Sequence, residues 1–565
     1  MMSIKRATIE KGIYKIRGRI NRTRHKNLES YLSLDVIPCS IATLLLATLF
    51  IIFLSAPVIM ARTDFQGPRV RPNIIVIVAD DMGFSDLGMM GSEIHTPNIN
   101  SLASNGLTLT QFYNAGRCCP SRASLLTGLY AHQAGVGDMT QDRGYPAYQG
   151  FLNKNCVTLA EVLGQAGYTT GMAGKWHVGE EMPNWPQRRG FTNFYGIPQG
   201  GGAYFFPFLV KRELWLNERP VTPSVDFYST DAFNEYATSF IEDQKKSNKP
   251  FFLYLAHIAP HFPLQAKPED IAKYRGKYKA GFHSIREKRW QQQKKLALFD
   301  PRVKPAMADA LVDNWDSLSI EQRDTLDLKM ATYAAQIESM DKGIGKIITK
   351  LKETNQLHNT LIMFFSDNGG ESDNAYPVKG ATGPIGSAKS WASYGPSWAY
   401  VSNTPFRKYK KYVHEGGIRT PMIIHYPRLI KKGRIEKEQA GHVIDIMPTL
   451  LEVAGATYPK SYNENVIAPL KGVSLLPVIQ NGTLAHRNLF WEHEGNRAVR
   501  SGQWKLVSTY PDNVWHLYDL KNDPTELNDL VMSQSGRAET LSGLYNNWAL
   551  QNNVLPWDKI VNNKK

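Results

Sequence analysis

Short, uninterrupted apolar runs recur along this chain and alternate with segments of helical periodicity. Each run has the length of one strand, and an uninterrupted apolar run is typical of a strand that is covered on both faces. The alternation of such strands with helices predicts an α/β fold built on a parallel sheet. The predicted strands are residues 74–79, 169–173, 251–256, 361–365 and 422–426.

Two further patterns extend this architecture. From residue 330 to residue 351, apolar residues recur at steps of three and four, which predicts a long amphipathic helix that packs on the sheet. After about residue 484 the runs become short and alternating, with turn-forming residues between them, which predicts a small antiparallel domain. We therefore expect a main domain over residues 68–484 and a C-terminal subdomain over residues 485–565.

The N-terminal region has a different pattern. Residues 1–35 contain nine Lys or Arg and three acidic residues, a net charge of +6, and residues 36–61 contain no charge. The uncharged run exceeds the roughly 20 apolar residues that cross a bilayer, and a basic flank stays cytosolic. We expect a basic cytosolic tail followed by a signal peptide or membrane anchor. Ala56 and Ala61 permit cleavage, whereas the long basic flank is unusual for a signal peptide.

On this interpretation the rest of the chain is exported and is periplasmic, extracellular or membrane-anchored facing outside the cytoplasm. The whole chain has a net charge of +15, so +9 remains outside the basic tail. These basic residues are scattered and form no DNA- or RNA-binding motif, which argues against a nucleic-acid partner and favours anionic substrates. We interpret the Lys-, Arg- and Gln-rich residues 267–304 as a solvated helical excursion in preference to a substrate-facing insertion.

The chain has four cysteines, too few for a disulfide scaffold, and their spacing fits no structural zinc site. A bond between Cys119 and Cys156 remains open.

Polar side chains follow four of the predicted strands where each strand ends. Ligands of an open parallel sheet bind beyond these ends, so the side chains should meet at one place. Carboxylate and amide oxygens suit calcium or magnesium, and Lys and His suit transfer of an oxyanion. Taken one at a time, each of these polar residues also has a purely structural explanation, such as capping a turn. The set consists of Asp80, Asp81, Lys175, His177, His257, His261, Asp367 and Asn368.

The sharpest local motif runs from Cys118 to Gly128. Pro120 suits the first turn of a helix, so Cys118 should lie at a helix N-terminus, where backbone N–H groups attract an anion. Such a place would also suit a thiolate nucleophile, as in a cysteine-dependent phosphatase. That class has its Arg six positions after the Cys, whereas Arg122 is four positions after Cys118, and this spacing argues against it.

The run from Cys118 to Gly128 resembles the signature of the type I sulfatases, Cys-x-Pro-Ser-Arg followed by a Leu-x-Thr-Gly-like helix. Further segments resemble the same family and follow in its order from about residue 72 to the C-terminal region. They are residues 79–83, 174–177, 260–264, 366–370, 403–410, 414–419, 517–520 and 523–526.

The resemblance implies an alkaline phosphatase-like fold, with a large doubly wound mixed sheet flanked by helices and a smaller C-terminal antiparallel sheet plus helix. It implies that a formylglycine-generating maturation enzyme converts Cys118 to formylglycine. One hydroxyl of the hydrated formylglycine would attack the sulfate ester, and the other would expel sulfate. One calcium ion would be bound by Asp80, Asp81, Asp367, Asn368 and the modified Cys118.

The same resemblance implies the other roles. Asp367 would also take the proton of the attacking hydroxyl, and Arg122 and Lys175 would hold the formylglycine hydrate. His177 would be the base that releases sulfate. Lys410 and His261 would hold the sulfate group and protonate the leaving oxygen.

One segment departs from the family pattern. Some lysosomal arylsulfatases have a Ser-His pair after a Gly-Ile-Pro turn, whereas this chain has Gln199 and three glycines up to Gly202. That part of the substrate pocket should differ. His257 and His493 can each be structural, and we leave both outside the core set.

The predicted activity is therefore hydrolysis of aryl or carbohydrate sulfates. A phosphodiesterase or phosphonate hydrolase on the same scaffold is the first alternative, although a dinuclear phosphatase site would need more His and Asp where Lys175 and Lys410 stand. A silent membrane-tethered binding protein is the second, and the retention of every matched polar residue argues against it.

Overall fold

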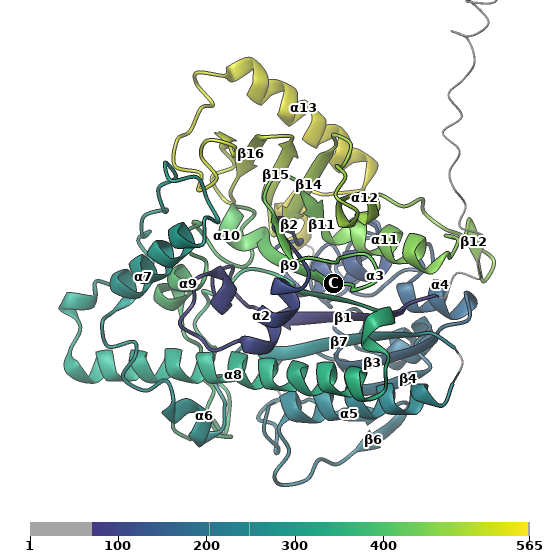
Figure 1. The fold of residues 1–565 in the computed structure, drawn as a ribbon. Helices are drawn as coiled ribbons and strands as arrows, with labels where there is room; N and C mark the ends of the chain where they lie inside the picture. Colours follow the sequence, from purple (N-terminus) through teal and green to yellow (C-terminus); the bar gives the residue numbers. More distant parts are fainter. Residues whose placement is uncertain (1–70, 203, 248, 563–565) are drawn as a thin grey trace, which may run out of the picture. The chain divides into compact units, whose positions relative to one another are not determined.

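A large mixed sheet with helices on both faces forms the centre of the protein (Figure 1). The structure, a computed structural model, describes residues 71–202, 204–247 and 249–562. Within these residues the sheet strands are β1 (Asn73–Asp80), β2 (Leu107–Tyr113), β3 (Thr169–Lys175), β4 (Asn193–Ile197), β5 (Leu214–Leu216), β6 (Arg219–Val221), β7 (Phe251–Pro260), β8 (Thr360–Ser366), β9 (Arg419–His425), β10 (Arg434–Glu436) and β11 (Gly441–His442). Their order is β10-β2-β9-β8-β1-β7-β3-β4-β5-β6, and β11 pairs with β2.

Four of the five predicted strands are neighbours in the middle of this sheet. β8, β1, β7 and β3 run parallel to one another, and their side chains are almost entirely buried. The fifth strand, β9, runs antiparallel to both β8 and β2. The doubly wound mixed sheet is confirmed, and the expectation of a parallel sheet is wrong at β9, because an apolar run reports burial but not direction.

Alternate residues of the central strands enter two separate cores. Ile75 and Ile77 of β1 belong to one core and Val76 and Val78 to the other, as the two-residue repeat of a strand requires. The first core contains α2 (Pro97–Ser104), α5 (Ser229–Lys245) and the predicted long helix, α8 (Ile320–Glu353). The second contains α3 (Cys118–Thr127), α4 (Leu159–Gln165) and α11 (Ile446–Ala454).

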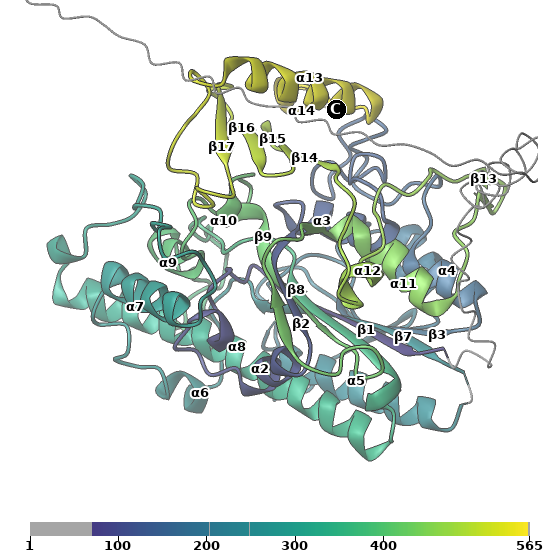
Figure 2. The same cartoon turned by 45° about the horizontal axis from the view of Figure 1, so that its top comes forward.

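The C-terminal region adds a second sheet, as predicted. β14 (Asn488–His493), β15 (Asn496–Ser501), β16 (Trp504–Ser508) and β17 (Trp515–Asp519) form an antiparallel four-stranded sheet, and α13 (Ser535–Gln551) lies across it (Figure 2). The shorter elements are α9 (Pro396–Ser402), α10 (Glu415–Ile418), α12 (Leu476–Ile479), α14 (Trp557–Val561) and the hairpin of β12 (Ser461–Tyr462) and β13 (Asn465–Val466). The described residues belong to one compact unit.

The basic residues 267–304 differ in part from the expectation. They contain the helices α6 (Pro268–Ala272) and α7 (Phe282–Lys295), but α7 is solvated on one face only. Its inner face is buried and includes Arg289, which pairs with Asp86 at 2.6 Å and with Glu93 at 2.8 Å. Part of the positive charge that led us to expect a solvated segment is therefore paired with carboxylates inside the protein.

The predicted cytosolic tail and the predicted signal peptide or anchor, residues 1–35 and 36–61, lie outside the described residues. Among the helices that are described, none has both the length and the apolar character to cross a bilayer.

Candidate active site

The carboxyl ends of the central strands bring the predicted site residues together. Asp80 and Lys175 are the last residues of β1 and β3, and Asp367 follows β8 directly. Asp81 and His177 have φ angles of 65° and 60°, a left-handed conformation that costs energy in a residue other than glycine. Strain of this kind is common where the backbone has to direct a functional side chain.

A first group of buried charges surrounds Asp80 and Asp367. The Lys175 ammonium is 2.6 Å from Asp80 Oδ2, and Arg122 Nη2 is 2.7 Å from Asp367 Oδ2 and 3.7 Å from Asp80 Oδ2. Arg122 also donates a hydrogen bond to the Lys175 carbonyl at 2.9 Å. These pairs are closed to solvent, so each cation offsets a carboxylate that would otherwise be costly to bury.

A second group surrounds Asp81. Lys410 Nζ lies 2.8 Å from both oxygens of Asp81 and 2.6 Å from Glu371 Oε2. His261 Nε2 is 3.4 Å from Asp81 Oδ2, and Asn368 Nδ2 donates to Asp81 Oδ1 at 2.7 Å. The predicted oxygen donors are thus brought together at one edge of the sheet with Arg122, Lys175, His261 and Lys410.

Unpaired oxygens identify the part of this site that fits a cation. Oδ1 of Asp80 and Oδ1 of Asn368 are buried and accept no hydrogen bond from the described residues. Ligand atoms of Asp80, Asp81 and His261 lie within 4.8 Å of one another. Buried oxygens of this kind need a partner, and a hard divalent cation prefers carboxylate and amide oxygens. The residues present therefore fit such a cation.

The pKa values of the carboxyl groups support the same conclusion. Burial raises the pKa of Asp81 to about 7 even though Lys410 lowers it. Burial, together with the negative charge of Asp80, also raises the pKa of Asp367 well above its ordinary value. Asp80 has the opposite balance, because Lys175, His261 and Arg122 outweigh burial and lower its pKa to about 2. A bound cation would favour the ionised form of all three groups.

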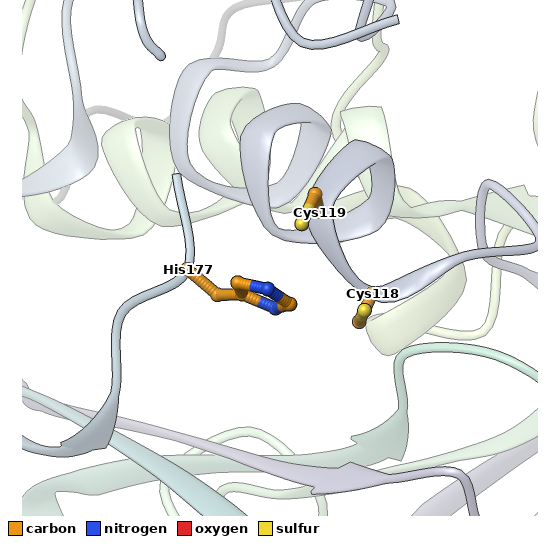
Figure 3. A group of neighbouring side chains, drawn as sticks. All are labelled: Cys118, Cys119 and His177. Atoms are coloured by element: carbon orange, nitrogen blue, oxygen red, sulfur yellow. The ribbon is translucent and has the colours of Figure 1, made fainter. Parts of the chain in front are cut away.

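Cys118 lies in the first turn of α3, as predicted. Cys118 and Cys119 lie on the helix and His177 on a neighbouring segment, with its imidazole directed toward the cysteines (Figure 3). Ligand atoms of the three residues lie within 4.8 Å of one another. A hydrogen bond from Cys119 lowers the pKa of Cys118 well below its ordinary value, against the effect of burial, and Lys175 and His177 lower it further.

Cys119 and Cys156 do not form a disulfide bond with each other. Cys119 and Cys156 are both free and buried. Burial raises the pKa of Cys119 well above its ordinary value, so Cys119 is a neutral thiol near pH 7. His177 is neutral near pH 7, because burial and the neighbouring Lys175 lower its pKa to about 4.

The two histidines outside the predicted core set are both fully buried. His257 lies inside β7 and not beyond its end, and burial lowers its pKa to about 3. His493 is the last residue of β14, and its ligand atoms lie within 4.8 Å of those of Asp138 and Glu494. The imidazole of His257 has no hydrogen-bond partner among the described residues, whereas His493 Nε2 lies 3.5 Å from Glu494 Oε1.

The sequence reasoning missed two charged residues of this site. Glu371 binds Lys410, and Arg117 precedes Cys118 and has two buried guanidinium nitrogens without a partner among the described residues. Their positions next to the 366–370 and 118–128 motifs were the available signal. Glu371 keeps a negative charge, because Lys410 and Arg117 outweigh burial and lower its pKa to about 2.

Comparison with known proteins decides the family. The family model described as sulfatase matches residues 72–456, more than half of the chain. The chain belongs to the sulfatase family. This enzyme is a sulfuric ester hydrolase of the alkaline phosphatase-like superfamily. A second model, described as the C-terminal part of N-sulphoglucosamine sulphohydrolase, matches residues 406–547 of this sulfatase.

Individual relatives agree with this assignment. An uncharacterized sulfatase of Schizosaccharomyces pombe is 37% identical, over 82% of this chain and 91% of its own. An arylsulfatase of Klebsiella aerogenes is 35% identical, over 74% of this chain and 94% of its own. The crystal structure of Ps i-CgsB in complex with k-i-k-neocarrahexaose has a TM-score of 0.65 at 28% identity, covering 86% of this chain and 94% of that one.

Proposed function

We propose that this sulfatase hydrolyses aryl or carbohydrate sulfate monoesters through a formylglycine derived from Cys118, with one bound calcium ion. The observation that carries the proposal is the position of Cys118. The negative charge of the Cys118 thiolate contributes to raising the pKa values of the nearby carboxyl groups, those of Asp80, Asp81 and Asp367. Lys175 and His177 in turn lower the pKa of Cys118. The sulfur of Cys118 stands where the oxygens of formylglycine would lie.

The surrounding residues have the properties that the proposed roles require. Arg122 and Lys175 are buried cations that can hold the hydrated formylglycine. Asp367 is paired with Arg122 at 2.7 Å, and in the ionised form that a bound cation favours it can accept a proton from the attacking hydroxyl. His177 is neutral near pH 7 and can act as the base for release of sulfate.

The sulfate group itself needs positive charge and a proton donor. Lys410 carries the charge that would hold a sulfate oxygen, and Glu371 and Asp81 fix the position of its ammonium. His261 Nε2 lies 3.4 Å from Asp81 Oδ2. Burial and Lys410 lower its pKa to about 4, and the negative charge of a bound sulfate would raise it, so that His261 could protonate the leaving oxygen. Calcium, held by Asp80, Asp81, Asp367 and Asn368, would neutralise charge on a sulfate oxygen as the S–O bond breaks.

The cellular setting follows from the sequence. We infer that residues 36–61 direct export, either as a cleaved signal peptide or as an anchor in the membrane, and that a formylglycine-generating enzyme matures the chain. The substrate range rests on relatives, which include an arylsulfatase and an N-acetylgalactosamine-6-sulfatase, the latter 28% identical to this chain. A phosphonate monoester hydrolase of Agrobacterium radiobacter shares the fold, with a TM-score of 0.53 at 20% identity.

Turnover of an aryl sulfate and of the matching aryl phosphate tests the proposal. The protein is produced together with a formylglycine-generating enzyme, and the Cys118→Ala variant serves as the control. We expect the sulfate to be the better substrate and the variant to be inactive on it. Preference for the phosphate would favour the phosphohydrolase alternative, and equal turnover by Cys118→Ala would contradict the nucleophile.

A further inference from the structure

A run of three glycines lies beneath the two histidines that act on the substrate in the proposed function. A methyl group added at Gly200 would be 2.8 Å from His177 Nε2, and one added at Gly201 would be 2.8 Å from His261 Nδ1. At Gly202 it would be 2.8 Å from the outer ring of Trp391. The rings of His177, His261 and Trp391 therefore lie, in that order, close to three consecutive glycines that have no side chain to keep them away.

The side chain of Arg212 hydrogen-bonds to the backbone of this glycine run. Arg212 Nε donates hydrogen bonds to the carbonyl oxygens of Gly200 and Gly201, at 3.1 Å and 2.9 Å. A partly buried guanidinium that holds consecutive carbonyls restricts an otherwise flexible segment. These two hydrogen bonds therefore restrict the backbone at Gly200 and Gly201.

Aromatic side chains continue the row of rings outward from His261. The imidazole of His261 stacks on Phe262, with ring centroids 4.6 Å apart. Phe262, Tyr376 and Trp391 contact one another, with centroid distances of 6.2, 5.9 and 5.6 Å. We call these three residues the ring cluster. Its outer member, Tyr376, is 54% exposed.

Two features of the ring cluster indicate that it binds a ligand. Tyr376 is exposed and is connected to His261 through Phe262, and an exposed aromatic residue beside a polar site loses little by being covered and gains by stacking. In addition, Nε1 of Trp391 is buried and donates to no acceptor among the described residues, so it can donate to a ligand.

We propose that the ring cluster is the subsite for the leaving group of the substrate, and that it accepts a ring with a flat apolar face. This inference rests on the proposed function, because it takes His261 as the acid for the leaving oxygen. Once that oxygen lies at His261, the group attached to it extends along Gly202 towards Trp391 and Tyr376. An aryl ring and the apolar face of a pyranose share the required chemistry, whereas a linear alkyl chain offers no face to stack.

The test compares kcat/KM for nitrophenyl sulfate, a pyranose sulfate and a linear alkyl sulfate, using the matured full chain. In Tyr376→Ala and Trp391→Ala we expect the ratio of ring substrate to alkyl substrate to fall by about threefold to tenfold, the size of a lost aromatic stacking contact. Tyr376→Phe keeps the ring and should keep the ratio. Tyr462→Ala, in the separate β12–β13 sheet, is the matched control and should leave the ratio unchanged.

The ratio of kcat/KM for ring and alkyl substrates distinguishes the subsite from the proposed function. A fall for the aryl or for the pyranose substrate supports the subsite and identifies which ring it takes. An unchanged ratio for both ring substrates in both alanine variants overturns it, while turnover by the parent enzyme still supports the proposed function. If the parent enzyme hydrolyses no sulfate ester at all, the proposed function and the subsite fail together.

Discussion

Two adjacent carboxyl groups, Asp80 and Asp81, have very different pKa values because their neighbours differ. Asp80 is surrounded by Lys175, His261 and Arg122, which together outweigh its burial. Asp81 has Lys410 as its main cation, and burial outweighs it. The cations beside Asp80 therefore keep it ionised, whereas the ionised form of Asp81 would be favoured by a bound cation.

Removing one oxygen donor should weaken cation binding without changing the nucleophile. We expect Asn368→Ala to raise the calcium concentration needed for half-maximal activity by at least about tenfold, since its unpaired Oδ1 is lost. Titration of calcium into chelator-treated enzyme measures this effect. Asn522→Ala, at an exposed asparagine, is the control, and an unchanged calcium requirement in Asn368→Ala would contradict the assigned ligand.

At the scale of the elements, the buried end of β9 contains a histidine that stays neutral near pH 7. His425 is the last residue of β9, and its Nδ1 is buried without a partner among the described residues. Burial, assisted by Lys352, lowers its pKa to about 4. The unfolded chain takes up this proton at the ordinary value of about 6.5, so the folded state loses stability as the pH falls from 6.5 towards 4.

This linkage should be measurable. Between pH 7 and pH 5, His425 should reduce the free energy of unfolding by about 2 kcal/mol. His425→Gln, which cannot take up a proton, should show a correspondingly smaller loss between these two pH values in denaturant titrations. His358→Gln, at an exposed histidine, controls for the change of residue type. Equal pH dependence in His425→Gln and the parent protein would show that His425 is not buried neutral.

The elements also show what the sequence could and could not predict. The strands β1, β3, β7 and β8 were predictable because burial on both faces leaves an uninterrupted apolar run. β2 was missed because Thr108 and Thr110 interrupt its apolar residues. α8 begins at Ile320, ten residues before its apolar stripe, because the Ser319–Gln322 capping box starts it on the surface. The site residues were predictable where a strand end coincides with a motif. Glu371 and Arg117 lie just outside the motifs, and only their contacts in the folded protein place them in the site.

At the scale of the whole molecule, a buried ion cluster joins the C-terminal sheet to the catalytic region. Lys505 of β16 lies 2.7 Å from Glu415 of α10 and 2.9 Å from Glu526, and all three side chains are closed to solvent. Burial would raise the pKa of Glu415, but Lys505, Arg419 and Arg500 lower it to about 2. Glu415 lies five residues after Lys410, so the cluster also supports the loop of the proposed sulfate clamp.

Breaking this cluster should affect the whole fold. Lys505→Ala leaves Glu415 and Glu526 without their shared cation, and we expect it to lower the free energy of unfolding by about 3–5 kcal/mol. Lys521→Ala, at an exposed lysine near the same sheet, should change it by less than about 0.5 kcal/mol. Denaturant unfolding followed by intrinsic fluorescence compares the two variants, and equal small losses would show that the cluster does not join the two regions.

The most direct test of the proposed activity is the mass of the peptide that contains Cys118. Trypsin cleaves after Arg117 and after Arg122, which isolates residue 118 in a peptide of residues 118–122. Protein made with a formylglycine-generating enzyme should contain an aldehyde at residue 118 in place of the thiol. An unmodified cysteine at residue 118, in a preparation where a control sulfatase is converted, would contradict the account.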